Sequence, residues 1–353
     1  MRIIIGLIIV LLTPVASYAE VLFEETFDDL ANWTVEQGIA GSSNCESDCG
    51  ITGWDAYRNQ GNLCSAGVTG RPGNNNIYIN PVAGYPVGSE TCRNSSAGCW
   101  THWLEACLAF SQFDDADALF VKRVNADPDV EYEELYVGFY IRFKDNMDWD
   151  STHTTSNAFK LWHIHHYTSG DSIWDFHSSN VNTPLAAGGI RSYNTAMYIY
   201  MDGICRVNLS CHGDVLFPIG TTTTVWQEGG LFDGNWHFIE IRTKRNSSVG
   251  VSDGLIEAWL DGDKLSYLEG YEGDDINFND SGSLHGFNSV IIGGNNMSWL
   301  ESGAACSTSM DDCEQWFSID DVVISDAYIG PDYDIGGTTP SISGCTITGV
   351  RAY

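Results

Sequence analysis

The chain has 353 residues, 43% of them hydrophobic, so it is long and apolar enough to bury a large globular core. Its 47 acidic and 16 basic residues give a formal net charge of −31, which argues against nucleic acid and anionic membranes as partners. Aromatic residues make up 12% of the chain, a level that favours sheets joined by tight turns and also suits stacking on sugar rings.

Residues 1–19 have the pattern of a secretory signal. Arg2 supplies the positive start, Ile3 to Leu12 form the apolar run, and a small-residue cleavage site ends at Ala19. The apolar run is too short for a membrane span. We therefore expect a secreted, extracellular monomer, with one β-domain over residues 20–330 and a linker-like tail over residues 331–353.

All 11 cysteines follow this signal, and cysteines in an exported chain indicate disulfide bonds. Connectivity does not follow from sequence, so the pairs remain candidates. They are Cys45 with Cys49, Cys64 with Cys107, Cys92 with Cys99, Cys205 with Cys211, and Cys306 with Cys313, which leaves Cys345 over. Zinc is the alternative, but the Cys45 and Cys49 spacing has no matching second half nearby.

Short segments of alternating apolar and polar residues recur along the chain, as expected for strands. A first strand is expected directly after the signal, and the Gly-, Asn- and Cys-rich region 41–98 predicts long loops. The segment from Trp100 to Phe113 fits either a short helix or a buried strand. Later strands are predicted at Leu135–Lys144, Trp236–Lys244, Leu255–Leu260, Ser289–Gly293 and Phe317–Ile324.

No segment shows a sustained helical period. The pattern therefore predicts an all-β fold, a concanavalin A-like jelly-roll β-sandwich with disulfide-stapled loops. Asp261-Gly262, after Leu255–Leu260, predicts a hairpin with a primed turn.

Residues 157–202 predict three strands whose side chains line one groove. Residues two apart share a face of a strand. This rule pairs Lys160 with Trp162, Arg191 with Tyr193, and Tyr198 with Tyr200. Such a groove presents cations and phenols among aromatic walls, which suits a sugar chain that carries carboxylates.

A chain of uronic acids can be cut by β-elimination. The reaction needs fixed donors beside the C6 carboxylate, a base for the C5 proton and an acid for the leaving O4. A nearby cation lowers the pKa of a tyrosine from its ordinary value of about 10. We assign Arg191 as the carboxylate clamp, Lys160 as its electrostatic partner, and Tyr198 or Tyr200 as base and acid. The alternative is that both tyrosines are half-buried sandwich surface and Arg191 is an ordinary ion-pair partner.

A cluster of histidines follows Lys160. His163 and His165 share a strand face and, with His166, suggest a zinc site completed by His177 or Asp175. We favour the interpretation as groove-lining or structural histidines, with His163 or His165 as a secondary candidate for the catalytic base. The residues expected to bind substrate are Tyr140, Arg142, Trp162, His165 and Tyr193.

Other chemistries find less support. A glycoside hydrolase needs two carboxylates on one strand face, and that pattern is missing. The chemistry requires no cofactor, and a structural calcium ion is the candidate metal, held by Glu25 or Asp28 early and Asp320 late.

At these residues the chain resembles the jelly-roll polysaccharide lyases, in particular the alginate and glucuronate lyases of family fourteen and the glucuronan lyases of family twenty. The matching segments occur in the family's order. They are Phe159-Lys160-Leu161 for Gly-Lys-Leu, Gly189-Ile190-Arg191 for Ser-x-Arg, Tyr198-Ile199-Tyr200 for Tyr-x-Tyr, and Trp236-His237 through Asp261-Gly262 for a Trp-His strand and its hairpin. Gly189 therefore stands where the family has Ser.

The resemblance covers residues 136–329. It implies a secreted lyase that cleaves an anionic, alginate- or glucuronan-like polysaccharide. Two alternatives stay open. One is a non-catalytic carbohydrate-binding sandwich of the concanavalin or laminin-G type, and the other, less favoured, is a glycoside hydrolase on the same fold.

Overall fold

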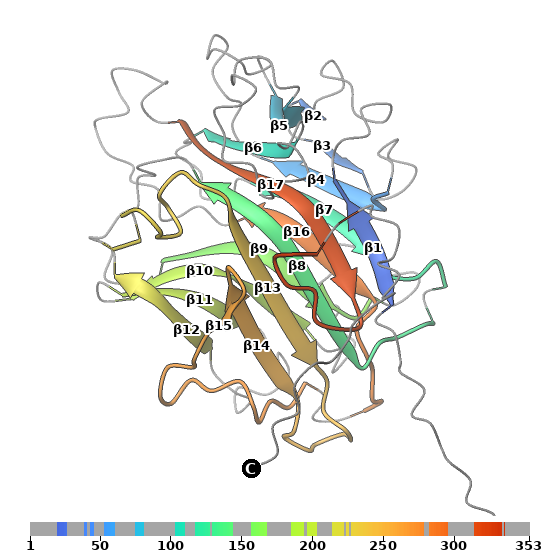
Figure 1. Cartoon of the computed structure of the whole chain (residues 1–353). Helices are drawn as coiled ribbons and strands as arrows, with labels where there is room; N and C mark the ends of the chain where they lie inside the picture. Colours follow the sequence, from blue (N-terminus) through green and yellow to red (C-terminus); the bar gives the residue numbers. More distant parts are fainter. Residues whose placement is uncertain are drawn as a thin grey trace, which may run out of the picture.

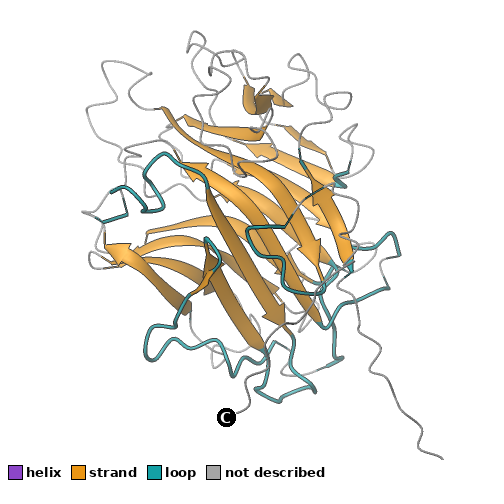
Figure 2. Ribbon diagram, in the orientation of Figure 1, coloured by secondary structure: helices purple, strands orange, loops and turns teal. Residues whose placement is uncertain are grey.

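All regular secondary structure in the described part of the chain is β-strand (Figure 2). The structure is a computed structural model, and it describes residues 20–26, 39–40, 43–45, 53–60, 75–80, 103–109, 117–127, 129–143, 157–167, 185–193, 196–202, 214–221, 224–225, 227–278, 282–295, 314–333 and 335. None of these residues forms a helix of the length and apolarity that crossing a membrane requires.

The strands form two antiparallel sheets that pack face to face (Figure 1). Sheet A contains, in spatial order, β15 (Asp263–Lys264), β14 (Leu255–Leu260), β13 (His237–Lys244), β8 (Glu134–Phe143), β17 (Glu314–Ser325), β6 (Trp103–Ala109), β5 (Asn75–Asn80) and β2 (Ile39–Ala40), and β1 (Val21–Glu25) also pairs with β17. Sheet B contains β12 (Val215–Thr221), β11 (Ala196–Asp202), β10 (Leu185–Tyr193), β9 (Asn157–His165), β16 (Ser289–Asn295), β7 (Asp117–Arg123), β4 (Ala56–Gln60) and β3 (Ser43–Cys45). The predicted all-β sandwich is confirmed.

The core lies between the two sheets because alternate residues of each strand point inward. In β8, Phe139 and Phe143 belong to this core, as the sequence pattern predicts. The Phe139 ring lies 6.0 Å from that of Trp162, and the Phe143 ring 6.2 Å from that of Phe159, both on β9. These contacts join sheet A to sheet B and identify the opposite side of each sheet as its outer face.

The segment from Trp100 to Phe113, for which the sequence left helix and strand open, contains strand β6. A further local prediction is confirmed at the turn after β14. Between β14 and β15, Asp261 has a φ of 53° and Gly262 a φ of 87°. A two-residue loop with both φ angles positive is a primed hairpin turn, as the Asp-Gly pair predicts.

A β-bulge interrupts the regular alternation of β9. Lys160 pairs with Gly189 of β10, but Trp162 pairs with the adjacent Gly188, so Leu161 is one residue in excess. Leu161 and Trp162 therefore both face the core, while Lys160 faces outward. The bulge brings the Phe159 carbonyl so close that a Cβ on Gly189 would lie 1.8 Å from its oxygen.

We expect Gly189→Ser, which installs the residue of the resembled family, to lower the free energy of unfolding by about 1–3 kcal/mol, because the new Cβ forces the bulge apart. Urea unfolding measures this effect. Ala187→Ser, on the same strand face, is the control because a Cβ is already present there. Equal stability of the two variants would show that the backbone of the bulge can move to accommodate the new Cβ atom.

Candidate functional site

Four of the predicted site residues lie on the outer face of sheet B. Lys160, Gly189 and Tyr200 stand directly opposite one another on β9, β10 and β11, and Arg191 stands opposite Tyr198 in the next row. Residues paired across antiparallel strands share a face. The structure thus brings two cations and two phenols together on three adjacent strands.

The outward direction of these side chains follows from their neighbours. Phe159, Ile190 and Ile199 alternate with them and belong to the core between the sheets. Because successive residues of a strand point to opposite sides, the site residues point away from that core. Gly189 places no side chain between Lys160 and Tyr200, whose strands lie two strand spacings, about 10 Å, apart.

Arg191 contacts both an acidic and an aromatic side chain in this arrangement. Its Nη1 forms an ion pair with Oδ2 of Asp214, the residue before β12. Its guanidinium carbon lies 5.7 Å from the centre of the Tyr200 ring, a cation–π distance. The exposed fractions of the Arg191 and Asp214 side chains are 18% and 31%, so the pair is partly open to solvent.

The two phenols are more enclosed than the two cations. Tyr198 is 7% exposed and Tyr200 is fully buried, and both pack with Leu216 of β12. Leu268 packs against the same group. Lys160, by contrast, is half-buried.

His163 and His165 lie on the same outer face, further along β9, and both are buried. Burial, and secondarily the charge of His166, lowers the pKa of His165 to about 3. His165 is therefore neutral at ordinary pH, so it cannot supply a positive charge to an anionic substrate.

The lowered pKa of His165 predicts a loss of stability in acid. Between pH 6.5 and about 3 the unfolded chain binds a proton that the folded chain does not, so stability falls as pH falls, by up to about 1.4 kcal/mol per pH unit. We expect His165→Gln to flatten this loss in urea titrations at several pH values. Burial lowers the pKa of His237, but Asp261 and Asp233 outweigh it and raise that pKa, so the stability that His237 contributes is complete below pH 6.5 and is lost only as pH rises. His237→Gln should therefore leave the slope of the acid loss unchanged. An acid loss unchanged by His165→Gln would contradict the assignment.

Trp162 corrects one prediction. The sequence rule placed it beside Lys160 on the groove face, but it is 1% exposed and lies in the core. Its Nε1–H donates a hydrogen bond to Sδ of Met201 at 2.9 Å. The bulge at Leu161 is the reason, because one extra residue reverses the side to which the following residues point.

Tyr140 and Arg142 lie on the outer face of sheet A and therefore do not share a surface with Arg191. The Tyr140 hydroxyl donates to the carbonyl of Pro331 at 2.6 Å, and Arg142 lies 4.9 Å from the Trp236 ring centre. Both side chains are buried. Alternation along β8 predicted their face correctly but carried no information on which sheet the strand joins.

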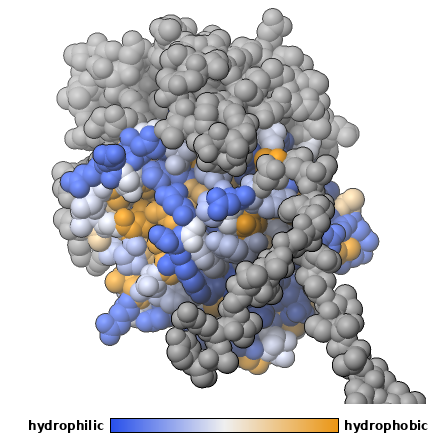
Figure 3. Space-filling model, viewed as in Figure 1, coloured by the Kyte–Doolittle hydropathy of each residue, from blue (hydrophilic) through white to orange (hydrophobic). Residues whose placement is uncertain are grey.

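The outer face of sheet A, which Figure 3 views, interleaves hydrophilic and hydrophobic residues. Charged side chains on this face form ion pairs with one another. Arg242 forms ion pairs with Glu134 at 2.8 Å and Glu257 at 2.6 Å, and Lys264 also pairs with Glu257. Arg191 on sheet B is paired in the same way with Asp214, so ion pairing does not distinguish the two faces.

Several predictions fall wholly or partly outside the described residues. Tyr193 ends β10, but its side chain is not among those described, and Asp28, Asp175 and His177 also lie outside. Glu25 accepts a hydrogen bond from Trp54 Nε1 at 3.2 Å, and Asp320 is buried in β17. The calcium site and the disulfide pairs stay predictions.

Asp214 is the site residue that the sequence analysis missed. It lies 23 positions beyond Arg191 and belongs to no motif. Only the pairing of β11 with β12 brings it to the guanidinium. The positions of charged residues along the chain do not predict that these two strands pair.

Comparisons with solved structures find chains of low sequence identity and low structural similarity. No protein-family model and no curated protein matches the chain. An endo-β-1,4-glucuronan lyase from the fungus Trichoderma reesei has a TM-score of 0.45 and 14% identity, covering 83% of this chain and 99% of that one. An alginate lyase variant in complex with an alginate trisaccharide has a TM-score of 0.33 and 14% identity, covering 64% and 82%. The botulinum neurotoxin serotype C1 binding domain has a TM-score of 0.36 and 10% identity, covering 65% of this chain and 41% of that one.

Proposed function

We propose that the outer face of sheet B binds a uronic-acid-containing polysaccharide, alginate- or glucuronan-like, and cuts it by β-elimination. The observation that carries this proposal is the meeting of Lys160, Arg191, Tyr198 and Tyr200 on three adjacent strands of one face. These side chains offer the two kinds of group that the reaction needs, fixed cations and phenols.

In this proposal the cations act on the substrate carboxylate. The Arg191 guanidinium pairs with the C6 carboxylate and, with the Lys160 ammonium, stabilises the charge that develops when the C5 proton leaves. Arginine suits this role because its planar donors match a carboxylate. The chain carries a net charge of −31, so this local pair of cations is what would hold a polyanion against general repulsion.

The phenols move the protons. An ionised tyrosine takes the C5 proton, the C5–H electrons form the C4=C5 double bond, and the C4–O4 bond breaks. A tyrosine hydroxyl returns a proton to O4, so atoms and charge balance. The Arg191 guanidinium, which lies 5.7 Å from the Tyr200 ring centre, would supply the nearby positive charge that an ionised phenol requires.

Asp214 competes with the substrate for Arg191. We expect Asp214→Asn to lower KM for a polyuronate about 1.5- to fivefold with little change in kcat, because a partly exposed ion pair contributes about 0.2–1 kcal/mol. Initial rates at low ionic strength measure this effect. A rise in KM would indicate that Asp214 orients Arg191 rather than competing for it.

One observation favours a second function. Tyr200 is fully buried and Tyr198 is 7% exposed, while Arg191 remains partly accessible. A carbohydrate-binding protein without catalysis would need the cations alone. In that case the two phenols serve as packing beneath the binding face.

One experiment distinguishes the lyase function from the binding function. The mature chain is incubated with alginate, with glucuronan and with a neutral glucan, and elimination is followed by absorbance at about 235 nm, where the unsaturated product absorbs. Binding is measured in parallel by calorimetry. Absorbance that rises on a polyuronate and not on the glucan supports the lyase. Binding without any rise supports the lectin-like function, and neither effect rejects both.

A further inference from the structure

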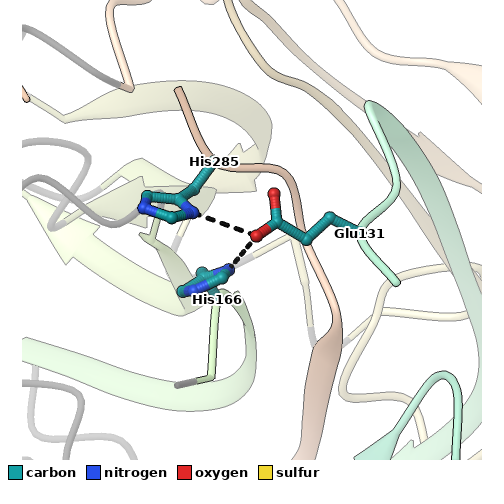
Figure 4. A group of neighbouring side chains, drawn as sticks. All are labelled: Glu131, His166 and His285. Carbon is teal, nitrogen blue, oxygen red and sulfur yellow. Dashed lines mark hydrogen bonds and ion pairs between the residues drawn. The ribbon is translucent and has the colours of Figure 1, made fainter. Parts of the chain in front are cut away.

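Glu131, His166 and His285 come together from three separate segments of the chain. Glu131 lies before β8, His166 directly follows β9, and His285 lies before β16. Figure 4 shows the Glu131 carboxylate directed at both imidazole rings. Oε1 of Glu131 lies 3.0 Å from Nδ1 of His285 and 3.4 Å from Nδ1 of His166.

The backbone around this cluster is held by hydrogen bonds. Tyr132 and Phe287 exchange two N–H···O bonds of 2.8 Å, and the Asn288 N–H donates to the His165 carbonyl at 3.1 Å. The Asn288 side chain also bridges the backbone of Tyr167, at 2.6 and 2.9 Å. Each of the three clustered residues therefore lies one or two positions from a hydrogen-bonded residue. The backbone holds their side chains close together without needing a bound ion.

The spacing of the side-chain atoms fits a metal ion. Zinc binds histidine nitrogen and carboxylate oxygen at about 2.0–2.2 Å, which places neighbouring ligand atoms of a tetrahedral site about 3.3–3.5 Å apart. The observed separations of 3.0 and 3.4 Å lie close to this range, and ligand atoms of all three residues lie within 4.8 Å of one another. We propose that Glu131, His166 and His285 bind a divalent transition-metal ion, with Zn²⁺ as its representative.

The outer contacts of Glu131 and the access to the cluster agree with this assignment. The Gly286 N–H donates to the second carboxylate oxygen at 2.6 Å, the kind of outer contact that orients a metal ligand. The exposed fractions of the Glu131 and His285 side chains, 26% and 33%, leave a path for an ion to enter.

The metal site is separate from the proposed lyase site. Lys160 lies near the start of β9 and His166 beyond its end, six residues or about 20 Å apart along an extended strand. The ion would join three segments of the sandwich, so its expected role is stabilisation. The proposal therefore does not depend on the lyase function.

The test uses the untagged mature chain, stripped with a chelator and dialysed against metal-free buffer. Calorimetric titration with ZnCl₂ is expected to give one ion per chain, with a raised melting temperature. Glu131→Gln and His285→Gln should each weaken binding about tenfold or more, since even losing an outer contact commonly costs about 10- to 100-fold. Glu133→Gln is the matched control, because it makes the same change two residues away at an exposed carboxylate.

A second readout needs no variant and keeps the test decisive if a substitution prevents folding. Diethylpyrocarbonate should modify His285 in the stripped protein, and Zn²⁺ should protect it, as peptide mass spectrometry can show. Binding of equal strength in both variants, with no protection of His285, would assign the zinc to other residues and overturn the proposal. Absence of zinc binding to the wild type would leave a hydrogen-bonded His–Glu–His cluster only, and would equally reject it.

Discussion

Replacing both Tyr198 and Tyr200 by phenylalanine is expected to remove elimination activity, with a fall in kcat of at least about 10²–10⁴-fold, the usual contribution of a positioned acid or base. The substitution deletes only two hydroxyl groups and keeps the rings that pack against Leu216. Binding of the polyuronate should persist because Lys160 and Arg191 are untouched. The measurement is the initial rate of unsaturated product formation together with calorimetric binding.

Tyr140→Phe is the matched control for this experiment. It deletes the same kind of hydroxyl group on sheet A, where Tyr140 donates to Pro331, and should leave the rate unchanged. The single variants Tyr198→Phe and Tyr200→Phe then show which phenol takes the proton. Full activity in the double variant would remove the tyrosines from the mechanism while leaving the cations in place.

Trp162→Ala is expected to lower the free energy of unfolding by about 3–5 kcal/mol, the usual cost of truncating a large buried aromatic residue. Trp162 is 1% exposed, contacts Phe139 across the core and donates to Met201. Urea unfolding measures this loss. The result distinguishes a core residue from the groove residue that simple alternation predicted.

The milder variant Trp162→Phe separates folding from function. It preserves most of the apolar volume, so the protein should remain folded, and KM for a polyuronate should equal that of the wild type. A large rise in KM with little loss of stability would instead place Trp162 in the binding site and contradict the bulge at Leu161.

Much of the fold follows from local pattern. The alternation of Val137, Phe139, Ile141 and Phe143 identifies a strand with one face in the core, and Asp261-Gly262 identifies a primed turn, because both depend on neighbours in the chain. The shared face of Tyr198 and Tyr200 follows in the same way. Alternation alone could not predict that they share a face with Lys160 and Arg191, because this depends on the order of strands in the sheet. The structure shows that β9, β10 and β11 are adjacent and antiparallel.

The remaining features depend on contacts that local pattern does not encode. A bulge adds one residue to β9 and turns Trp162 into the core, and its trace in the sequence is the adjacent apolar pair Leu161-Trp162 between two polar residues. Tyr140 lies on a strand that alternates like the strands of the predicted groove, but that strand, β8, belongs to sheet A. Glu131 and His285 are 154 positions apart, so only the folded chain reveals that they meet beside His166.

The mass of the fragments released from a polyuronate tests the central claim most directly. If Lys160, Arg191 and the two tyrosines on sheet B carry out β-elimination, each cut yields a fragment with an unsaturated terminal sugar, lighter by one water molecule than the product of hydrolysis. We predict that these lighter fragments appear with the wild type and disappear with Arg191→Ala. Fragments that carry the added water, or unsaturated fragments formed equally well by Arg191→Ala, would contradict the account.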